Sequence, residues 1–202
     1  MKVKIWLVGL VFSASLVLVI YALPAITANF SVLKGSGRPV PASVLQVIDA
    51  QTLLVRFKNR KEICVVLNGI NTPLKQQLGY RRSVLGMIDL VQGDFRNELL
   101  VQVDAVLNSK VWLVSIYDLQ EEVLGNLALI RFGYAWPDNY LSEDSALTAH
   151  YLGEAKTALE EAKQNTRGHW AGINIGELPH KPPQSYLTQV QTLGHSSEQC
   201  KP

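Results

Sequence analysis

Two turns of this chain carry side chains with the oxygen atoms that a hard cation would need. The first turn holds Asp49, Gln51 and Thr52, and the second holds Asn71 and Thr72. A cation such as Ca²⁺ prefers anionic oxygens, and Asp49 alone among these side chains carries a negative charge. Gln51 and Asn71 can offer only neutral carbonyl oxygens, which hold a hard cation poorly.

Basic side chains lie in the hairpin between these two turns and in the next expected helix. They are Arg56, Lys58, Arg60, Lys61, Arg81 and Arg82, with Lys75 and Lys110 as further candidates. A cluster of this kind could contact the phosphates of a nucleic acid. However, few aromatic residues lie among the charges, and the formal net charge is only +2. An ordinary solvated surface therefore explains them better.

The elements that must position these residues are short strands and helices. β-branched and aliphatic residues predict strands over 44–48, 53–57, 63–67, 99–107 and 111–117. Apolar residues at helical spacing predict helices over 80–92 and 126–132, and a longer helix that ends near residue 165. The expected fold class is α+β, with five strands and about three helices.

The order of these residues resembles that of staphylococcal-nuclease-like (thermonuclease) domains. The similar stretches are 48–52 (IDAQT), 67–73 (LNGINTP), 126–135 (NLALIRFGYA) and 154–170 (EAKTALEEAKQNTRGHW). The resemblance spans roughly residues 41–174. It implies an OB-type β-barrel with helices packed against it.

Nucleases of this family, as the resemblance implies, bind Ca²⁺ through carboxylates, place a glutamate near the attacking water, and hold the phosphate with two arginines. This chemistry needs fixed positive charge on the phosphate and a base beside the water. The corresponding positions in this chain are Asp49, Gln51, Val66, Asn71, Leu74, and Lys110 or Val111 for the second arginine. Leu74 cannot act as a base, and Val66 cannot donate a hydrogen bond. The resemblance therefore predicts a degenerate site with no catalytic residue, no bound metal and no cofactor.

This mismatch predicts a catalytically inactive nuclease-like domain that works as a binding or scaffold subunit. Two alternatives stay open. The first is a membrane-tethered, Ca²⁺-dependent nuclease whose site is rebuilt around Asp49, Glu62 or Asp118. The second is a module that binds nucleic acid without cleaving it.

The N-terminal region predicts one transmembrane helix. Residues 5–23 are strongly apolar and uncharged, and as a helix they would span roughly 28 Å, close to the thickness of a bilayer core. The alternative is a cleaved signal peptide, whose apolar region is usually shorter. Lys2 and Lys4 place the N-terminus in the cytoplasm and the domain on the exported side, periplasmic or equivalent. The expected partners are the membrane and other proteins of a membrane-associated complex, and an exported domain would rarely meet nucleic acid.

The expected organisation has four parts: a signal anchor over 1–28, a linker over 29–42, the nuclease-like domain over 43–175 and a flexible tail over 176–202. The two cysteines are far apart. Cys64 falls in a predicted strand and is expected to be a small buried hydrophobic residue, and Cys200 is in the tail. Their spacing matches no metal or redox motif.

Overall fold

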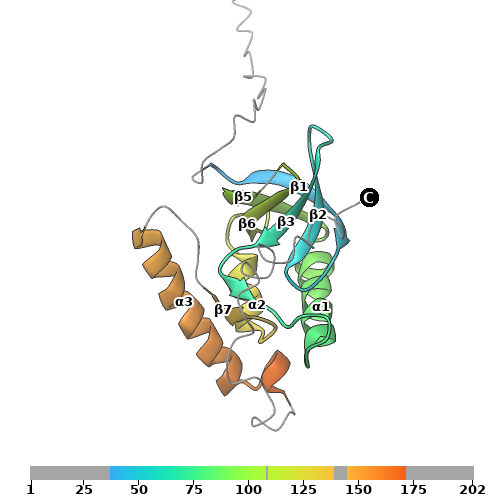
Figure 1. Cartoon of the computed structure of the whole chain (residues 1–202). Coiled ribbons are helices and arrows are strands. Elements are labelled where there is room, and N and C mark those ends of the chain that lie inside the picture. Colours follow the sequence, from blue (N-terminus) through green and yellow to red (C-terminus); the bar gives the residue numbers. More distant parts are fainter. Residues whose placement is uncertain (1–36, 108, 139–144, 172–202) are drawn as a thin grey trace, which may run out of the picture. The chain divides into compact units, whose positions relative to one another are not determined.

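The computed structural model describes residues 37–107, 109–138 and 145–171. Within these residues five strands close into a barrel in the order β1-β2-β3-β6-β5 (Figure 1). The barrel strands are β1 (Val40–Val47), β2 (Thr52–Phe57), β3 (Glu62–Leu67), β5 (Glu98–Val106) and β6 (Val111–Tyr117). Two short strands, β4 (Ile70–Asn71) and β7 (Trp136–Pro137), pair separately.

The barrel encloses an apolar core. Neighbouring strands are antiparallel except for β3 and β6, which run parallel. Alternate strand residues point inward, because successive side chains project to opposite faces of a strand. The inward set is almost fully buried: Leu53, Val55, Ile63, Val65, Leu67, Val101, Val114 and Ile116. The same alternation directs Arg56 and Glu62 outward, where both are exposed.

The helices lie around one end of the barrel (Figure 1). Helix α1 (Tyr80–Ile88) continues as the π-helix η1 (Asp89–Asp94), and helix α2 (Gly125–Arg131) packs against β6 and against the long helix α3 (Ser145–Gln164). A short 3₁₀ turn, η2 (Gly168–Trp170), follows α3. Helix α3 turns one apolar face inward, formed by Tyr151, Ala155, Ala158 and Ala162.

This architecture is α+β and compatible with the expected OB-type barrel. Two boundaries differ from the sequence-based expectation. Strand β1 begins at Val40, inside the expected linker, because residues Val40 to Ser43 pair with β5. The expected helix over 80–92 has regular α geometry only to Ile88 and then widens into η1.

The described residues contain no helix that is long and apolar enough to cross a membrane. The predicted span over residues 5–23 and the predicted tail over 176–202 lie outside the described residues.

Candidate functional site

The first turn is closed by its own hydrogen bonds. The backbone N–H groups of Ile48 and Asp49 both donate to the carbonyl of Thr52, and Asp49 Oδ1 accepts from the backbone N–H of Gln51 at 2.8 Å. An aspartate that accepts from the backbone two residues later is a common turn-stabilising arrangement. Burial raises the pKa of Asp49, while the hydrogen bonds from Gln51 and Thr52 act in the opposite direction. Asp49 therefore braces the turn.

The side-chain amide of Gln51 joins the two turns. Its Nε2 donates to the carbonyls of Leu67 at 3.1 Å and Ile70 at 2.8 Å. Its Oε1 accepts from Thr72 Oγ1 at 3.4 Å, and the residue is 2 % exposed. The structure thus brings together two of the four stretches on which the resemblance rests. Both hydrogens of the Gln51 side-chain amide donate to backbone carbonyl oxygens. A carboxylate at this position would repel those oxygens.

Two buried side chains, from Asn126 and Tyr151, bond to the backbone that leads into the second turn. Asn126 Nδ2 donates to the carbonyls of Asn68 at 2.8 Å and Val114 at 3.2 Å, and its Oδ1 accepts from Ile116 N. Tyr151 Oη donates to the carbonyl of Gly69 at 2.8 Å. Sequence reasoning did not assign either residue to the site. Asn126 stands among apolar residues in the sequence of its helix. A buried asparagine must satisfy its amide inside the protein, so this pattern was the sequence signal for a structural role.

The residues at the family's metal positions do not fit Ca²⁺. Asn71 is buried in β4, and the Gln51 amide hydrogens face the carbonyls of Leu67 and Ile70. Leu74 is half-buried, and its backbone N–H donates to Gln77 Oε1 at 2.8 Å. No group of three or more histidine, cysteine, aspartate or glutamate residues in the described part of the chain is arranged to hold a metal. Ca²⁺ needs several anionic oxygens, and these positions supply too few of them.

Of the two positions that the resemblance assigns to arginines, Val66 is apolar and buried, and the second is either the exposed Lys110 or the buried Val111. Cys64, Val66, Val111 and Leu113 form one buried cluster, against which Ile48, Ala105 and Leu107 pack. We call Cys64, Val66, Val111 and Leu113 the outer apolar cluster, because strand alternation directs them to the same face of the barrel as Arg56 and Glu62. Cys64 is disulfide-bonded, so its interpretation as merely a small buried hydrophobic residue was incomplete.

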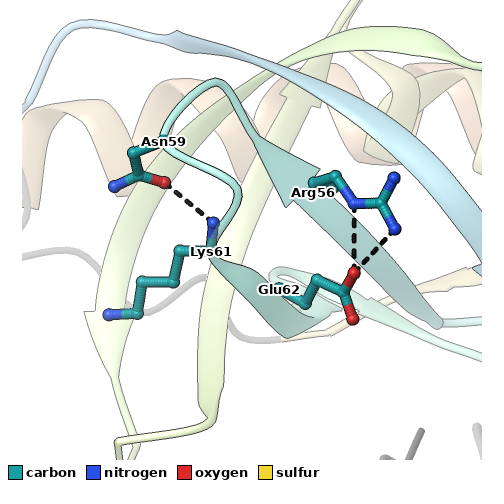
Figure 2. A network of polar contacts seen from close by, with 4 residues as sticks. All are labelled: Arg56, Asn59, Lys61 and Glu62. Atoms are coloured by element: carbon teal, nitrogen blue, oxygen red, sulfur yellow. Dashed lines mark hydrogen bonds and ion pairs between the residues drawn. The ribbon is translucent and has the colours of Figure 1, made fainter.

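The carboxylates of the alternative, rebuilt site make contacts of their own. Glu62 Oε1 accepts from Arg56 Nε at 3.0 Å and from Nη2 at 2.7 Å on the β2–β3 hairpin (Figure 2). Asp118 Oδ1 accepts from the backbone N–H groups of Glu122 and Val123 in the turn after β6. These contacts brace local turns, as Asp49 does.

The basic residues fall into two separate groups. The tip of the β2–β3 hairpin, residues 58–61, lies at the opposite end of the barrel from α1 (Figure 1). On the hairpin, Arg56 pairs with Glu62, and Lys61 Nζ lies 4.9 Å from the centre of the Trp112 ring. Lys58 and Arg60 are exposed there, and Lys110, directly before β6, is exposed too.

On helix α1, Arg81 is exposed and lines an open pocket of about 520 Å³. Arg82 lines the same pocket, but its Nη1 donates to the carbonyls of Gly168 at 2.7 Å and Ala171 at 3.2 Å. The guanidinium of Arg82 therefore fastens η2 to α1. The expected basic residues do not form one continuous phosphate-binding surface.

A serine–histidine pair lies inside the protein, and sequence reasoning did not find it. Ser83 on α1 and His169 on η2 are each 1 % exposed. The His169 ring stacks on Trp136, with 4.8 Å between the ring centres. Such a pair resembles a nucleophile and its base, but substrate cannot reach a pair this deeply buried. The pair joins helix α1 to the 3₁₀ turn η2.

Comparison with known protein families finds no family model that matches this chain, and comparison with curated proteins finds no match either. The resemblance to nuclease-like domains therefore depends on the quoted motifs and on the barrel.

Proposed function

We propose that this chain is a membrane-anchored, nuclease-like barrel that has kept its framework without an active site, and that it works as a binding or scaffold subunit of a membrane-associated assembly. The observation that carries the proposal is the Gln51 amide. It occupies the position of a metal-binding carboxylate and bonds to the Leu67 and Ile70 carbonyls. The Gln51 side chain therefore stabilises the fold by joining two turns.

The outer apolar cluster supports the same conclusion. Phosphodiester hydrolysis needs positive groups fixed on the phosphate, because negative charge develops on its oxygens in the transition state. Val66, at the position that corresponds to one arginine, and Val111, one of two candidates for the other, are fully buried among apolar neighbours. A phosphate placed there would lose its hydration without gaining a charge partner, so the site disfavours the substrate as well as the reaction.

The proposed location is the exported side of a membrane, with residues 5–23 as the anchor. The disulfide at Cys64 supports this side. Disulfides persist in oxidising compartments and are rare where glutathione and thioredoxin keep thiols reduced. The proposed partners are accordingly the membrane and exported portions of other proteins.

The deciding experiment is a nuclease assay on the full-length protein, with Ca²⁺ present at several pH values and with DNA and RNA substrates. We expect no hydrolysis above the background of a parallel mock purification. Calorimetric titration should give a Ca²⁺ dissociation constant no better than millimolar, because Gln51, Asn71 and Leu74 supply no charge. Specific cleavage, or micromolar Ca²⁺ affinity, would instead establish the alternative of a divergent nuclease.

A second measurement separates the scaffold from a non-cleaving nucleic-acid module. Fluorescence anisotropy with labelled single-stranded and duplex DNA at 50 and 200 mM salt should show no saturable binding. Tight binding that weakens steeply with salt, and that is lost on Lys58→Glu and Arg60→Glu substitution, would favour the nucleic-acid module.

A further inference from the structure

The outer apolar cluster is buried although it faces away from the barrel interior. In the parallel β3–β6 pair, Cys64 lies opposite Val111 and Val66 lies opposite Leu113. The intervening residues, Val65 and Trp112, belong to the inner face, where Trp112 packs on Phe57 at 5.6 Å between ring centres. Nevertheless the four outward residues are at most 2 % exposed.

Side-chain exposure differs strongly between neighbouring residues on the outward face of β3. Glu62 precedes Cys64 by two residues, points to the same face, and keeps 35 % of its side chain exposed. An outward residue in the middle of a strand loses its remaining exposure only when another segment lies over it. Ile48, Ala105 and Leu107 pack around the cluster but are themselves only partly buried. A further segment therefore covers the outer apolar cluster.

The disulfide identifies the covering segment. Cys64 is disulfide-bonded, and the sequence contains one other cysteine, Cys200. We infer that the C-terminal segment, residues 172–202, docks over the outer apolar cluster and is tethered there by a disulfide between Cys64 and Cys200. The occupant of the face is thus a segment of the same chain.

The segment has the length and composition that this docking requires. Residues 172–199 lie between the last described residue, Ala171, and Cys200. Their extended reach of about 90 Å exceeds the width of a domain of this size, which is roughly 40 Å. The segment also carries apolar side chains shortly before the cysteine: Tyr186, Leu187, Val190 and Leu193. These can cover an apolar face, whereas the polar residues around them stay in water.

Formation of the tether needs an oxidant. Two thiols lose two protons and two electrons, and a donor disulfide of an exported thiol oxidase accepts them and leaves as two thiols. The thiolate of one cysteine attacks the donor, and the second cysteine then displaces the donor's sulfur. This chemistry belongs to the oxidising side of a membrane.

One consequence concerns the lost active site. The cluster includes Val66 and Val111, so the docked segment would lie where a phosphate approaches in a nuclease of this type. That consequence rests on the proposed function, whereas the tether and the docking do not. A nuclease assay can therefore overturn the proposed function and leave the tether intact.

The tether is tested on the full-length protein, produced in an oxidising compartment and purified in detergent. Alkylation without reduction, protease digestion and mass spectrometry should yield a Cys64 peptide cross-linked to a Cys200 peptide, from a protein that migrates as a monomer on a non-reducing gel. Alkylation of both cysteines before reduction would overturn the tether. A disulfide-linked dimer would overturn it too.

Docking is tested separately, in the Cys200→Ser background, by the rate at which maleimide alkylates Cys64. We expect slow alkylation in Cys200→Ser, and an increase of about tenfold when Leu187→Asp and Val190→Asp are added, since charge there weakens apolar docking. The matched control carries Gln189→Asp and Gln191→Asp, with the same added charge at polar positions, and should stay slow. Equal rates in the three variants, whether fast or slow, would show that the segment does not cover Cys64.

Hydrogen exchange on the unsubstituted protein provides a test that needs no variant. Amides within residues 172–202 should be protected in the oxidised protein and should exchange faster after reduction. Complete exchange of the segment within seconds in the oxidised protein would contradict the docking.

Discussion

Ser83 Oγ lies 2.7 Å from His169 Nε2, and the same hydroxyl donates to the backbone carbonyl of Tyr134. Because Ser83 has a single hydroxyl hydrogen, His169 must donate from Nε2, which leaves Nδ1 as an acceptor. In the described structure Nδ1 is buried without a hydrogen-bond partner. Mainly through burial, with a smaller effect of Arg82, the pKa of His169 is lowered from 6.5 to about 4.

This histidine should make the protein sensitive to acid. The folded state keeps His169 neutral, whereas the unfolded chain protonates it near pH 6.5, so its contribution is complete above pH 6.5 and is lost as pH falls towards 4. The free energy of unfolding should fall by up to about 3 kcal/mol over this window. Urea unfolding at a series of pH values should show a shallower decline in His169→Gln. Parallel pH profiles for the two proteins would contradict this assignment.

A glutamate in place of Gln51 should destabilise the joined turns. Gln51→Glu replaces the donor that bonds to Leu67 O and Ile70 O with a buried acceptor. We expect a loss of about 2–4 kcal/mol at pH 7, with partial recovery near pH 4.5, where a protonated carboxyl can donate once. The exposed Gln46→Glu on β1 is the matched control and should stay within about 0.5 kcal/mol of the parent protein. Equal urea midpoints for both variants would argue against the amide's role.

Substitution of Asp49 by asparagine should change stability in the opposite direction to Gln51→Glu. Burial raises its pKa, so the folded state favours the neutral carboxyl, and this contribution is lost as pH rises through the folded pKa. Asp49→Asn keeps the acceptor for the Gln51 N–H and removes the partly buried charge. It should therefore be more stable than the parent at pH 7, with a smaller difference at pH 3. Asp49→Ala, which removes the acceptor, should lose about 1 kcal/mol, and an equal loss in Asp49→Asn would refute the argument from burial.

Repair of the site should create a Ca²⁺-dependent protein. The structure joins the turns that carry Gln51 and Thr72, so Gln51→Asp, Asn71→Asp, Leu74→Glu and Val66→Arg together should rebuild a charged cleft beside Asp49. The variant should melt at a lower temperature in chelator, because its carboxylates repel one another, and recover with Ca²⁺. Each single substitution should give little Ca²⁺-dependent recovery, because residues that act as a unit are strongly non-additive. Melting curves that Ca²⁺ does not shift would mean that the proposed cleft does not exist.

Residues 5–23 should keep the protein in the membrane. After alkaline carbonate washing, we expect the full-length protein in the membrane pellet, because this apolar stretch is long enough to span a bilayer. N-terminal sequencing of the recovered protein provides the check. A soluble form that begins near Asn29 would show that the segment is a cleaved signal peptide.

The barrel was predictable because its strands are coded locally. β-branched residues in alternation place β2, β3, β5 and β6 within one residue of their observed starts, and small residues at helical spacing identify the buried face of α3. The start of β1 was missed because Val40 and Pro41 become strand residues only through pairing with β5, and that contact is distant in sequence.

The interior polar contacts were not predictable for a similar reason. Nothing in the order of residues places Ser83 next to His169, or Tyr151 next to Gly69, since each pair joins segments far apart in the chain. The turns at Asp49 and Asn71 could be located by their motifs. That Gln51 would use its amide hydrogens on the Leu67 and Ile70 carbonyls depends on distances that only the folded chain defines.

The closure of the barrel restricts how any partner can bind it. Because β1 pairs with both β2 and β5, every barrel strand has a neighbour on each side. No barrel strand is therefore a free edge along its whole length to which an incoming peptide could add as a further strand. Recognition at the barrel would then depend mainly on side chains and turns, so a partner would distinguish this chain from another barrel of the same shape by its surface chemistry.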